Sequence, residues 1–244
     1  EMVELVAEFL RKLRAEEVGP ATTMLLGRPF PRWSPKVLEV SWATLHELIL
    51  RLTRVRPGEF AAAFDRTGDL GAATAIVFES GRRRRQAVFI EEPLTISEVR
   101  KTFEKISQLK GPGVRERKER LLETMLSRAT PQEAKYLVKV IIGEMRTGFQ
   151  EGLMELAVAE AFNVPHDAIR RAAMFTGEIA DVAEIAKARG EEGVKALKPE
   201  VFRPIQPMLA QNVERVEEAL EIHRGMTAFE HKIDGARVQI HKSG

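Results

Sequence analysis

Apolar residues recur every three or four positions through most of the first two hundred residues, and this spacing places them on one face of an α-helix. The spacing predicts helices at residues 3–13, 57–64, 95–109, 116–126, 131–142, 152–162, 165–174, 178–188 and 191–196. Thr130 and Pro131 mark one helix start, because threonine caps helices and proline is tolerated in the first turn. Alternation typical of strands is scarce before about residue 204, so this part of the chain is predicted to be helical throughout.

The character of the sequence changes at about residue 197. Closely spaced prolines between residues 199 and 207 indicate a linker. Beyond it, the pattern predicts one helix at 213–223 and two short strands between residues 228 and 242. One helix and two strands are too few for an independently stable sheet domain. We therefore predict a mainly α chain, with a helical domain at 1–197 and a linker and the truncated start of an α/β (α+β) domain at 198–244.

Two short signatures each occur twice in the helical part of the chain. An apolar helix end closed by glycine occurs at Gly27 and again at Gly143, and a Thr-Gly turn followed by an acidic residue occurs at 67–69 and again at 176–178. Because the two separations are similar, we predict an internal duplication with copies at about 1–78 and 116–196. The alternative is coincidence, since glycine ends many helices.

Composition narrows the possible function classes. The net charge is only +2, so nucleic-acid binding would need local clusters of basic residues. The chain has no cysteine, which excludes disulfides and thiolate chemistry, and its five histidines lack the spacing of a metal site. No apolar run reaches the ~18 residues of a membrane span. We expect a cytoplasmic protein without membrane association, with Trp33 and Trp42 packed in the first helical copy.

Two glycine-containing basic loops are candidate phosphate-binding sites. Residues 110–120 carry five basic and two acidic side chains, and a second, shorter loop spans 146–148. Glycines let a phosphate approach the backbone, and the amides at a following helix N-terminus can donate to it, although Pro112 removes one donor. The candidate contacts are Gly111, Gly113, Arg115, Lys118, Arg146 and Gly148. The alternative is a solvated helix start, and the four arginines at 82–85 could contact backbone phosphates, although such a run is more often a solvated loop.

A lysine-centred motif lies near the C-terminal end of the sequence. It combines Lys232 of a Lys-x-Asp-Gly core with Glu230 two residues before and Arg237 five residues after. A lysine attacks phosphorus only as a free amine, whereas a lysine of pKa ~10.4 is protonated at neutral pH. A catalytic site would lower that pKa by desolvation, for which Ile233 and Val238 predict an apolar setting, or by a metal and Arg237. The alternative is a hairpin with a charged tip.

Residues 230–237 resemble the adenylation motif of ATP-dependent DNA ligases, close to the archaeal form. Residues 203–210 resemble the segment that opens the adenylation domain of this family, and 143–148 and 67–71 resemble parts of its helical DNA-binding domain. The similarity covers essentially the whole chain in the order of the family. It implies a two-lobed, internally duplicated helical DNA-binding domain followed by the first elements of a nucleotidyltransferase domain.

The resemblance also implies a reaction. Lys232 would attack the α-phosphate of ATP, release pyrophosphate and carry AMP, which would pass to the 5′-phosphate of a nick before the 3′-hydroxyl displaces it. Glu230 matches the residue of the family that recognises adenine, and Arg237 matches its contact to the nucleotide or nick phosphate. His231 departs from the aromatic or apolar residue that is common there. The Mg²⁺ ligands of the family belong to later motifs, so no metal ligand is expected among these 244 residues.

The resemblance implies nicked duplex DNA as the partner of a monomeric enzyme of DNA repair, replication and recombination, with a sliding clamp as a further candidate partner. A duplicated unit would suit the approximate twofold symmetry of a duplex. Two alternatives remain open. The chain could be a non-catalytic DNA-binding fragment, or it could belong to the RNA ligases or RNA-capping enzymes, which share Lys-x-Asp-Gly but not the helical unit.

Overall fold

The computed structural model describes residues 1–84, 93–207, 212–231, 233–236 and 238–244, with only the backbone at 82–84. Its helices are α1 (Met2–Lys12), α2 (Ala15–Leu25), α3 (Trp42–Thr53), α4 (Pro57–Thr67), α5 (Leu70–Arg84), α6 (Ile96–Gln108), α7 (Val114–Arg128), α8 (Pro131–Ile142), α9 (Glu151–Phe162), α10 (His166–Thr176), α11 (Ile179–Lys195) and α12 (Val216–His223). The predicted mainly helical fold is confirmed. No helix in these ranges is long and apolar enough to cross a membrane.

The structure confirms several helix boundaries and corrects others. Helix α8 has the predicted ends, and the Thr130 hydroxyl accepts the Glu133 amide at 3.2 Å while the Glu133 carboxylate accepts the Thr130 amide at 2.7 Å. The helices predicted at 178–188 and 191–196 are joined in α11, with a break at Gly190 (φ 60°). The prediction of two strands between 228 and 242 was wrong for the described residues, none of which belongs to a strand.

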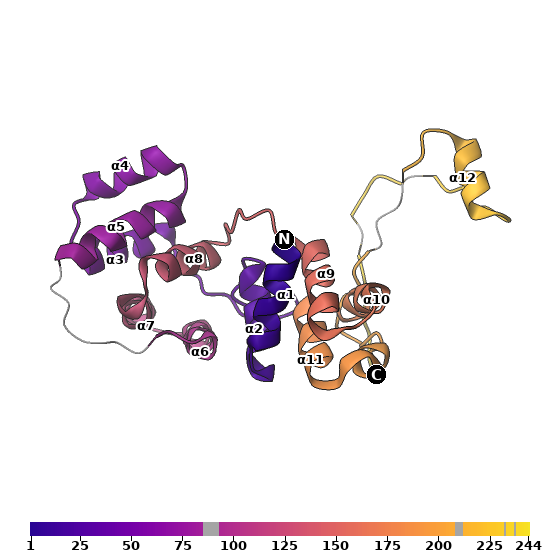
Figure 1. The fold of residues 1–244 in the computed structure, drawn as a ribbon, viewed down its shortest axis with the longest axis horizontal. Coiled ribbons are helices and arrows are strands. Elements are labelled where there is room, and N and C mark those ends of the chain that lie inside the picture. Colours follow the sequence, from indigo (N-terminus) through magenta and orange to yellow (C-terminus); the bar gives the residue numbers. More distant parts are fainter. Residues whose placement is uncertain (85–92, 208–211, 232, 237) are drawn as a thin grey trace.

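The helices form two lobes, each with its own hydrophobic core (Figure 1). The first lobe comprises α3 to α8, and fully buried Leu45, Phe103 and Leu122 lie in its core. The second lobe comprises α1, α2 and α9 to α11, with Leu10 and Ile169 among its buried residues. The second lobe therefore joins the first 25 residues of the chain to helices that begin at residue 151.

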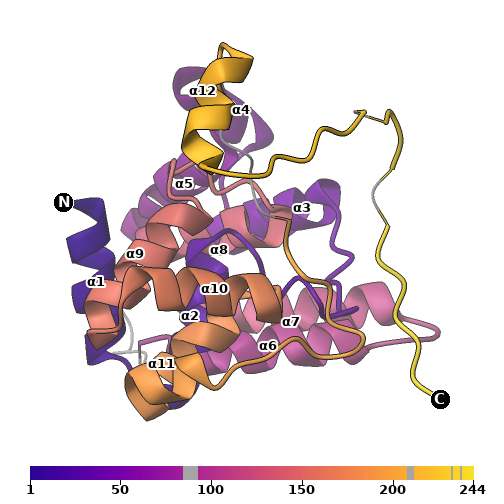
Figure 2. The same ribbon diagram turned by 90° about the vertical axis from the view of Figure 1, so that its right-hand side faces the viewer.

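The packing of helices across the two halves of the sequence is reciprocal. Helices α1 and α2 pack against α9 and α11, and α7 and α8 pack against α3 and α5. Figure 2 shows α1 beside α9 in the second lobe. Where the connections between the lobes meet, a Cβ atom on Gly27 would lie 2.9 Å from that of Met145. This exchange fits two copies of one helical unit, but the duplication itself and the copy boundaries remain a prediction.

The two Thr-Gly turns have matching hydrogen bonds. The hydroxyl of the threonine donates to a carbonyl four residues earlier and accepts the amide two residues later, at 2.9 and 3.4 Å for Thr67 and at 3.0 and 3.3 Å for Thr176. The following glycines, Gly68 and Gly177, have φ values of 62° and 70°, which glycine adopts without strain. Each turn thus ends one helix and directs the residue after the glycine back into the lobe.

A carboxylate follows each turn and pairs with a cation from the other half of the sequence. Asp69 pairs with Lys139 of α8, and Glu178 pairs with Arg28, just after α2, at 3.1 Å. Glu178 is completely buried, and Lys139 nearly so. Burial acts to raise the pKa of Asp69, but the hydrogen bonds from Lys139 and the Ala72 amide, together with the positive charge of Lys139, outweigh it and the pKa falls. These pairs tie the exchanged helices to the lobes that receive them.

The two tryptophans have different environments. Trp42 lies against His46 and Phe60, with ring centroids 5.6 and 5.7 Å away, and this confirms its predicted packing in the first lobe. The same prediction was wrong for Trp33, which is 41% exposed and belongs to the surface of the second lobe. Its ring lies under the guanidinium of Arg203, 4.9 Å from the centroid. Arg203 of the linker therefore covers Trp33, which the sequence alone assigned to the core.

Candidate nucleotide-accepting segment and nucleic-acid interface

The segment that carries the lysine motif lies apart from both helical cores. Helix α12 buries none of its residues and stands away from the lobes in Figure 1. Glu230 is exposed, and so is Ile233, which is 88% exposed. Lys232 and Arg237 lie outside the described residues. The apolar setting predicted from Ile233 and Val238 was therefore wrong for this structure, because both side chains face solvent.

The described residues of this segment offer a possible partner for the base of a nucleotide but no site for a metal ion. The Glu230 carboxylate is accessible and could accept hydrogen bonds from an adenine amino group. Among the described residues, no three histidine, aspartate or glutamate side chains cluster closely enough to hold a metal ion. None of the residues that the structure describes is therefore assigned to Mg²⁺ coordination.

The linker runs beside the residues that follow the motif. The Ile205 amide donates to Gln239 Oε1 at 2.9 Å, and the Gln239 amide group donates back to the Ile205 carbonyl. The Phe202 amide donates to His241 Nδ1 at 3.2 Å. These contacts join residues 34 and 39 positions apart and hold the end of the described chain against the linker.

The loop before α7 has the backbone that a phosphate site needs. Gly111 and Gly113 have φ values of 83° and 67°, and Gly113 caps α7 without any side-chain hydrogen bond to the first-turn amides. The first amides of a helix have no partner within it and can donate to an anion. Arg115 is exposed there and pairs with Glu119 at 2.9 Å and with Glu47 at 3.0 Å. The hydrogen bond to Glu119 raises the pKa of Arg115, which stays charged.

Lys118 differs from the other candidates because it is buried. Its side chain is on the inner face of α7, where its Nζ donates to the Leu38 carbonyl at 2.8 Å and to Glu39 at 3.3 Å. These bonds satisfy the ammonium inside the first lobe. Lys118 is therefore not available to contact a phosphate at the surface of this loop.

The second candidate loop follows α8. Arg146 and Gly148 both have positive φ, at 47° and 71°, and both are exposed. The guanidinium of Arg146 pairs with Glu144 at 2.7 Å, so an incoming phosphate would have to compete with that carboxylate. The side chains of residues 82–84 and all of Arg85 lie outside the described part, so the arginine run at 82–85 stays unassigned.

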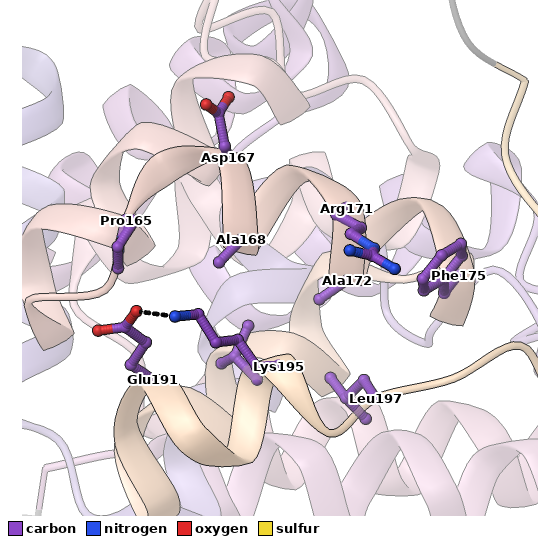
Figure 3. Close-up of a pocket in the computed structure, with 10 residues that line it drawn as sticks. Pro165, Asp167, Ala168, Arg171, Ala172, Phe175, Glu191, Lys195 and Leu197 are labelled. Atoms are coloured by element: carbon purple, nitrogen blue, oxygen red, sulfur yellow. Dashed lines mark ion pairs between the residues drawn. The ribbon is translucent and has the colours of Figure 1, made fainter.

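A pocket that the sequence did not predict lies between α10 and the end of α11 (Figure 3). It has a volume of about 460 Å³, and Arg171 stacks on Phe175 at its wall, 5.3 Å from the ring centroid. Glu191 and Lys195 form an ion pair on the facing wall. Acidic and basic side chains balance there, so the pocket favours no ligand charge and we assign it no function.

Comparison with known proteins adds the family. Residues 1–159 match the family described as DNA ligase N terminus, which covers more than half of the chain. The chain belongs to the ATP-dependent DNA ligase family. Residues 207–244 match the ATP dependent DNA ligase domain, in the order that the sequence predicted.

Archaeal relatives match along the whole chain. It is 38% identical to a DNA ligase of Methanopyrus kandleri over 242 residues, which are 99% of the chain and 43% of that protein. A DNA ligase of Thermococcus fumicolans is 38% identical over 98% of the chain, and DNA ligase 1 of Korarchaeum cryptofilum is 39% identical over 99% of it. Each of these two matches covers 42% of the relative, so the chain spans about two fifths of their length.

Proposed function

We propose that this chain is the DNA-binding and nucleotide-accepting part of an ATP-dependent ligase that seals nicks in duplex DNA. The observation that carries the proposal is the Lys-x-Asp-Gly motif at 232–235, which lies inside the region that matches the ligase domain. The match to DNA ligases along the helical part argues against an RNA ligase or capping enzyme, which would share the motif alone.

In the proposed reaction, the Nζ atom of Lys232 attacks the α-phosphorus of ATP while the bond to pyrophosphate breaks, and the lysine loses its proton. AMP then moves from the lysine to the 5′-phosphate of the nick. The 3′-hydroxyl attacks that phosphate, AMP leaves, and the phosphodiester is closed. Bound magnesium would supply positive charge that offsets the charge on the phosphates. Arg237 would favour the free amine of Lys232 and contact phosphate, and Glu230 would accept a hydrogen bond from adenine.

The helical unit would hold the duplex through its backbone phosphates. Gly111 and Gly113 expose the amides at the start of α7, and Arg115 adds charge beside them. Arg146 and Gly148 offer a second contact after α8. Contacts to phosphate position a duplex without reading its sequence, which a ligase that seals any nick requires. A monomeric state, a cytoplasmic location and a sliding clamp as partner remain expectations.

One observation favours a narrower role for residues 1–244 taken alone. Among the described residues of this segment, Glu230 and Ile233 are exposed, so neither would shield a lysyl phosphoramidate from water. We accordingly expect residues 1–244 to bind DNA but not to form the adenylate efficiently, whereas a protein of the length of the relatives would do both.

Intact-protein mass spectrometry tests the proposal. A protein that carries this chain at the length of its relatives should gain the mass of one AMP with ATP and magnesium, and Lys232→Ala should abolish the gain. The His231→Phe variant restores a residue type common in the family and serves as a folded control that keeps the lysine. No adduct on the long protein, or an adduct that survives Lys232→Ala, would refute the reaction.

A further inference from the structure

The second Thr-Gly turn differs from the first in what lies against it. A Cβ atom on Gly177 would lie only 2.5 Å from the carbonyl oxygen of Pro204 in the linker, whereas one on Gly68 would meet nothing within 4 Å. Both glycines have the same left-handed backbone. The linker backbone therefore approaches one turn so closely that only glycine fits there, and it leaves the equivalent turn open.

Gln206 fastens the linker to the end of α10. Its backbone amide donates to the Met174 carbonyl at 3.1 Å, and its side-chain Nε2 donates to the Gly177 carbonyl at 3.2 Å. The last carbonyls of a helix have no partner within it and need one from elsewhere. The linker supplies these donors, so it completes the end of α10 and does not merely pass over it.

Arg203 provides a second attachment. Its guanidinium donates to Asp181 Oδ2 at 2.6 Å and stacks on Trp33, whose indole nitrogen donates to the same oxygen at 3.0 Å. Asp181 is 19% exposed and Arg203 30% exposed, so both charges are largely removed from water. A stacked, charge-assisted pair of this kind fixes the direction of the arginine as well as its distance.

The position that matches Asp181 in the first turn has no carboxylate. Asp181 comes three residues after Glu178, and Ala72 comes three residues after Asp69. An alanine cannot pair with an arginine, and the first turn has no linker against it. The attachment is therefore specific to the second lobe and does not follow from the turn alone.

We propose that Trp33, Gly177 and Asp181 form a dock for the linker, and that Arg203 and Gln206 are positioning residues seated in it. The docked linker in turn holds Gln239 and His241, which follow the lysine motif closely along the chain. The proposed ligase must bring its lysine to a nick held by the helical unit. By shortening the freely moving chain between that unit and the lysine motif, the dock raises the effective concentration of the lysine at the nick. This role rests on the proposed function, whereas the dock itself does not.

Amide hydrogen exchange on residues 1–244 tests the dock. In the unmodified chain, the amides of Ile205 and Gln206 should exchange at least about tenfold more slowly than in an unstructured peptide. The Gly177→Ala variant should raise their exchange about tenfold or more and leave α9 unchanged. Gly68→Ala is the matched control, because it imposes the same backbone penalty on a turn with no linker against it.

Arginine variants test the second attachment. Arg203→Met should release the same two amides, and Arg203→Lys should restore part of their protection, since lysine keeps the charge but loses the planar stack. Unprotected linker amides in the unmodified chain would overturn the dock. Equal effects of Gly177→Ala and Gly68→Ala would overturn it as well.

Nick sealing by the long protein separates the dock from the proposed reaction. Gly177→Ala and Arg203→Met should leave lysyl-AMP formation unchanged and slow transfer to the nick by about tenfold, with partial rescue by Arg203→Lys. Protected linker amides in a protein that never forms lysyl-AMP would reject the reaction and keep the dock. Normal transfer in variants whose linker is released would reject the positioning role.

Discussion

Glu178 should be the most sensitive single charge in the helical unit. It is fully buried, and its carboxylate accepts hydrogen bonds from the Arg28 guanidinium at 3.1 Å, the Arg32 amide at 2.8 Å and the Ala180 amide at 3.2 Å. In Glu178→Gln, the side-chain nitrogen must face at least one of these donors. A charge-assisted hydrogen bond is worth about 1.5–3 kcal/mol, and breaking a buried pair costs up to about 5 kcal/mol.

Arg28 keeps a second partner in the variant, which lowers the expected cost. It also pairs with Glu151 at 3.2 Å, so its guanidinium would not be left alone. We therefore expect Glu178→Gln to lower the free energy of unfolding by about 2–3 kcal/mol. With a urea m-value of about 2–3 kcal/mol/M, the unfolding midpoint should fall by about 1 M without a change in slope.

Glu151→Gln is the matched control for this measurement. It changes the same chemical group beside the same arginine, but Glu151 is 24% exposed and water can replace part of what it loses. Glu151→Gln should lower the free energy of unfolding by less than about 1 kcal/mol. Urea unfolding followed by circular dichroism measures both variants. If Glu178→Gln costs no more than Glu151→Gln, the reasoning from burial and donor count is wrong.

Three further predictions concern DNA, pH and the crossing between the lobes. Arg115→Ala should weaken binding to nicked duplex and lower the slope of log affinity against log salt by about 1, and an unchanged slope in a salt titration would remove Arg115 from the interface. The hydrogen bond from Arg128 lowers the pKa of Glu98 to about 2, from 4.5. The ionised Glu98 carboxylate therefore stabilises the fold fully above about pH 4.5, and this stabilisation is lost as the pH falls toward 2. Glu98→Gln should therefore flatten the pH dependence of Tm in that window, and parallel curves would contradict this. Gly27→Ala should cost more than Gly143→Ala, by roughly 1–3 kcal/mol in urea unfolding, because both have positive φ but only Gly27 has a neighbour in the way.

Sequence predicted best the helices whose ends have local chemical signals. The cap at Thr130 and the glycine at 143 define α8, and both act within a few residues of the chain. Helix α5 was missed because it contains Gly71 and Gly81, which weaken a helix prediction. In the folded chain, a Cβ atom at either glycine would lie 2.8 Å from a carbonyl of a neighbouring helix. Tertiary packing thus requires the very residues that obscure the helix.

The candidate site was predicted less completely, and for a different reason. A run of basic residues reveals charge but not the burial of each side chain, so Lys118 was grouped with Arg115 although Lys118 is buried and Arg115 is exposed. The contact between Arg203 and Trp33 joins residues 170 positions apart, and no local pattern indicates it. The roles of Lys232 and Arg237 remain predictions from the motif, since both residues lie outside the described part of the chain.

The reciprocal exchange of helices has a consequence for how the chain folds during synthesis. Helices α1 and α2 leave the ribosome well before their partners α9 and α11, which lie over a hundred residues later in the chain. The second lobe therefore cannot fold until α11 has been synthesised. Until then, the apolar face of α1 stays exposed to solvent. The first lobe can close earlier, because α8 ends at residue 142. Folding on the ribosome should thus proceed from the middle of the sequence outward, with the N-terminal helices docking last.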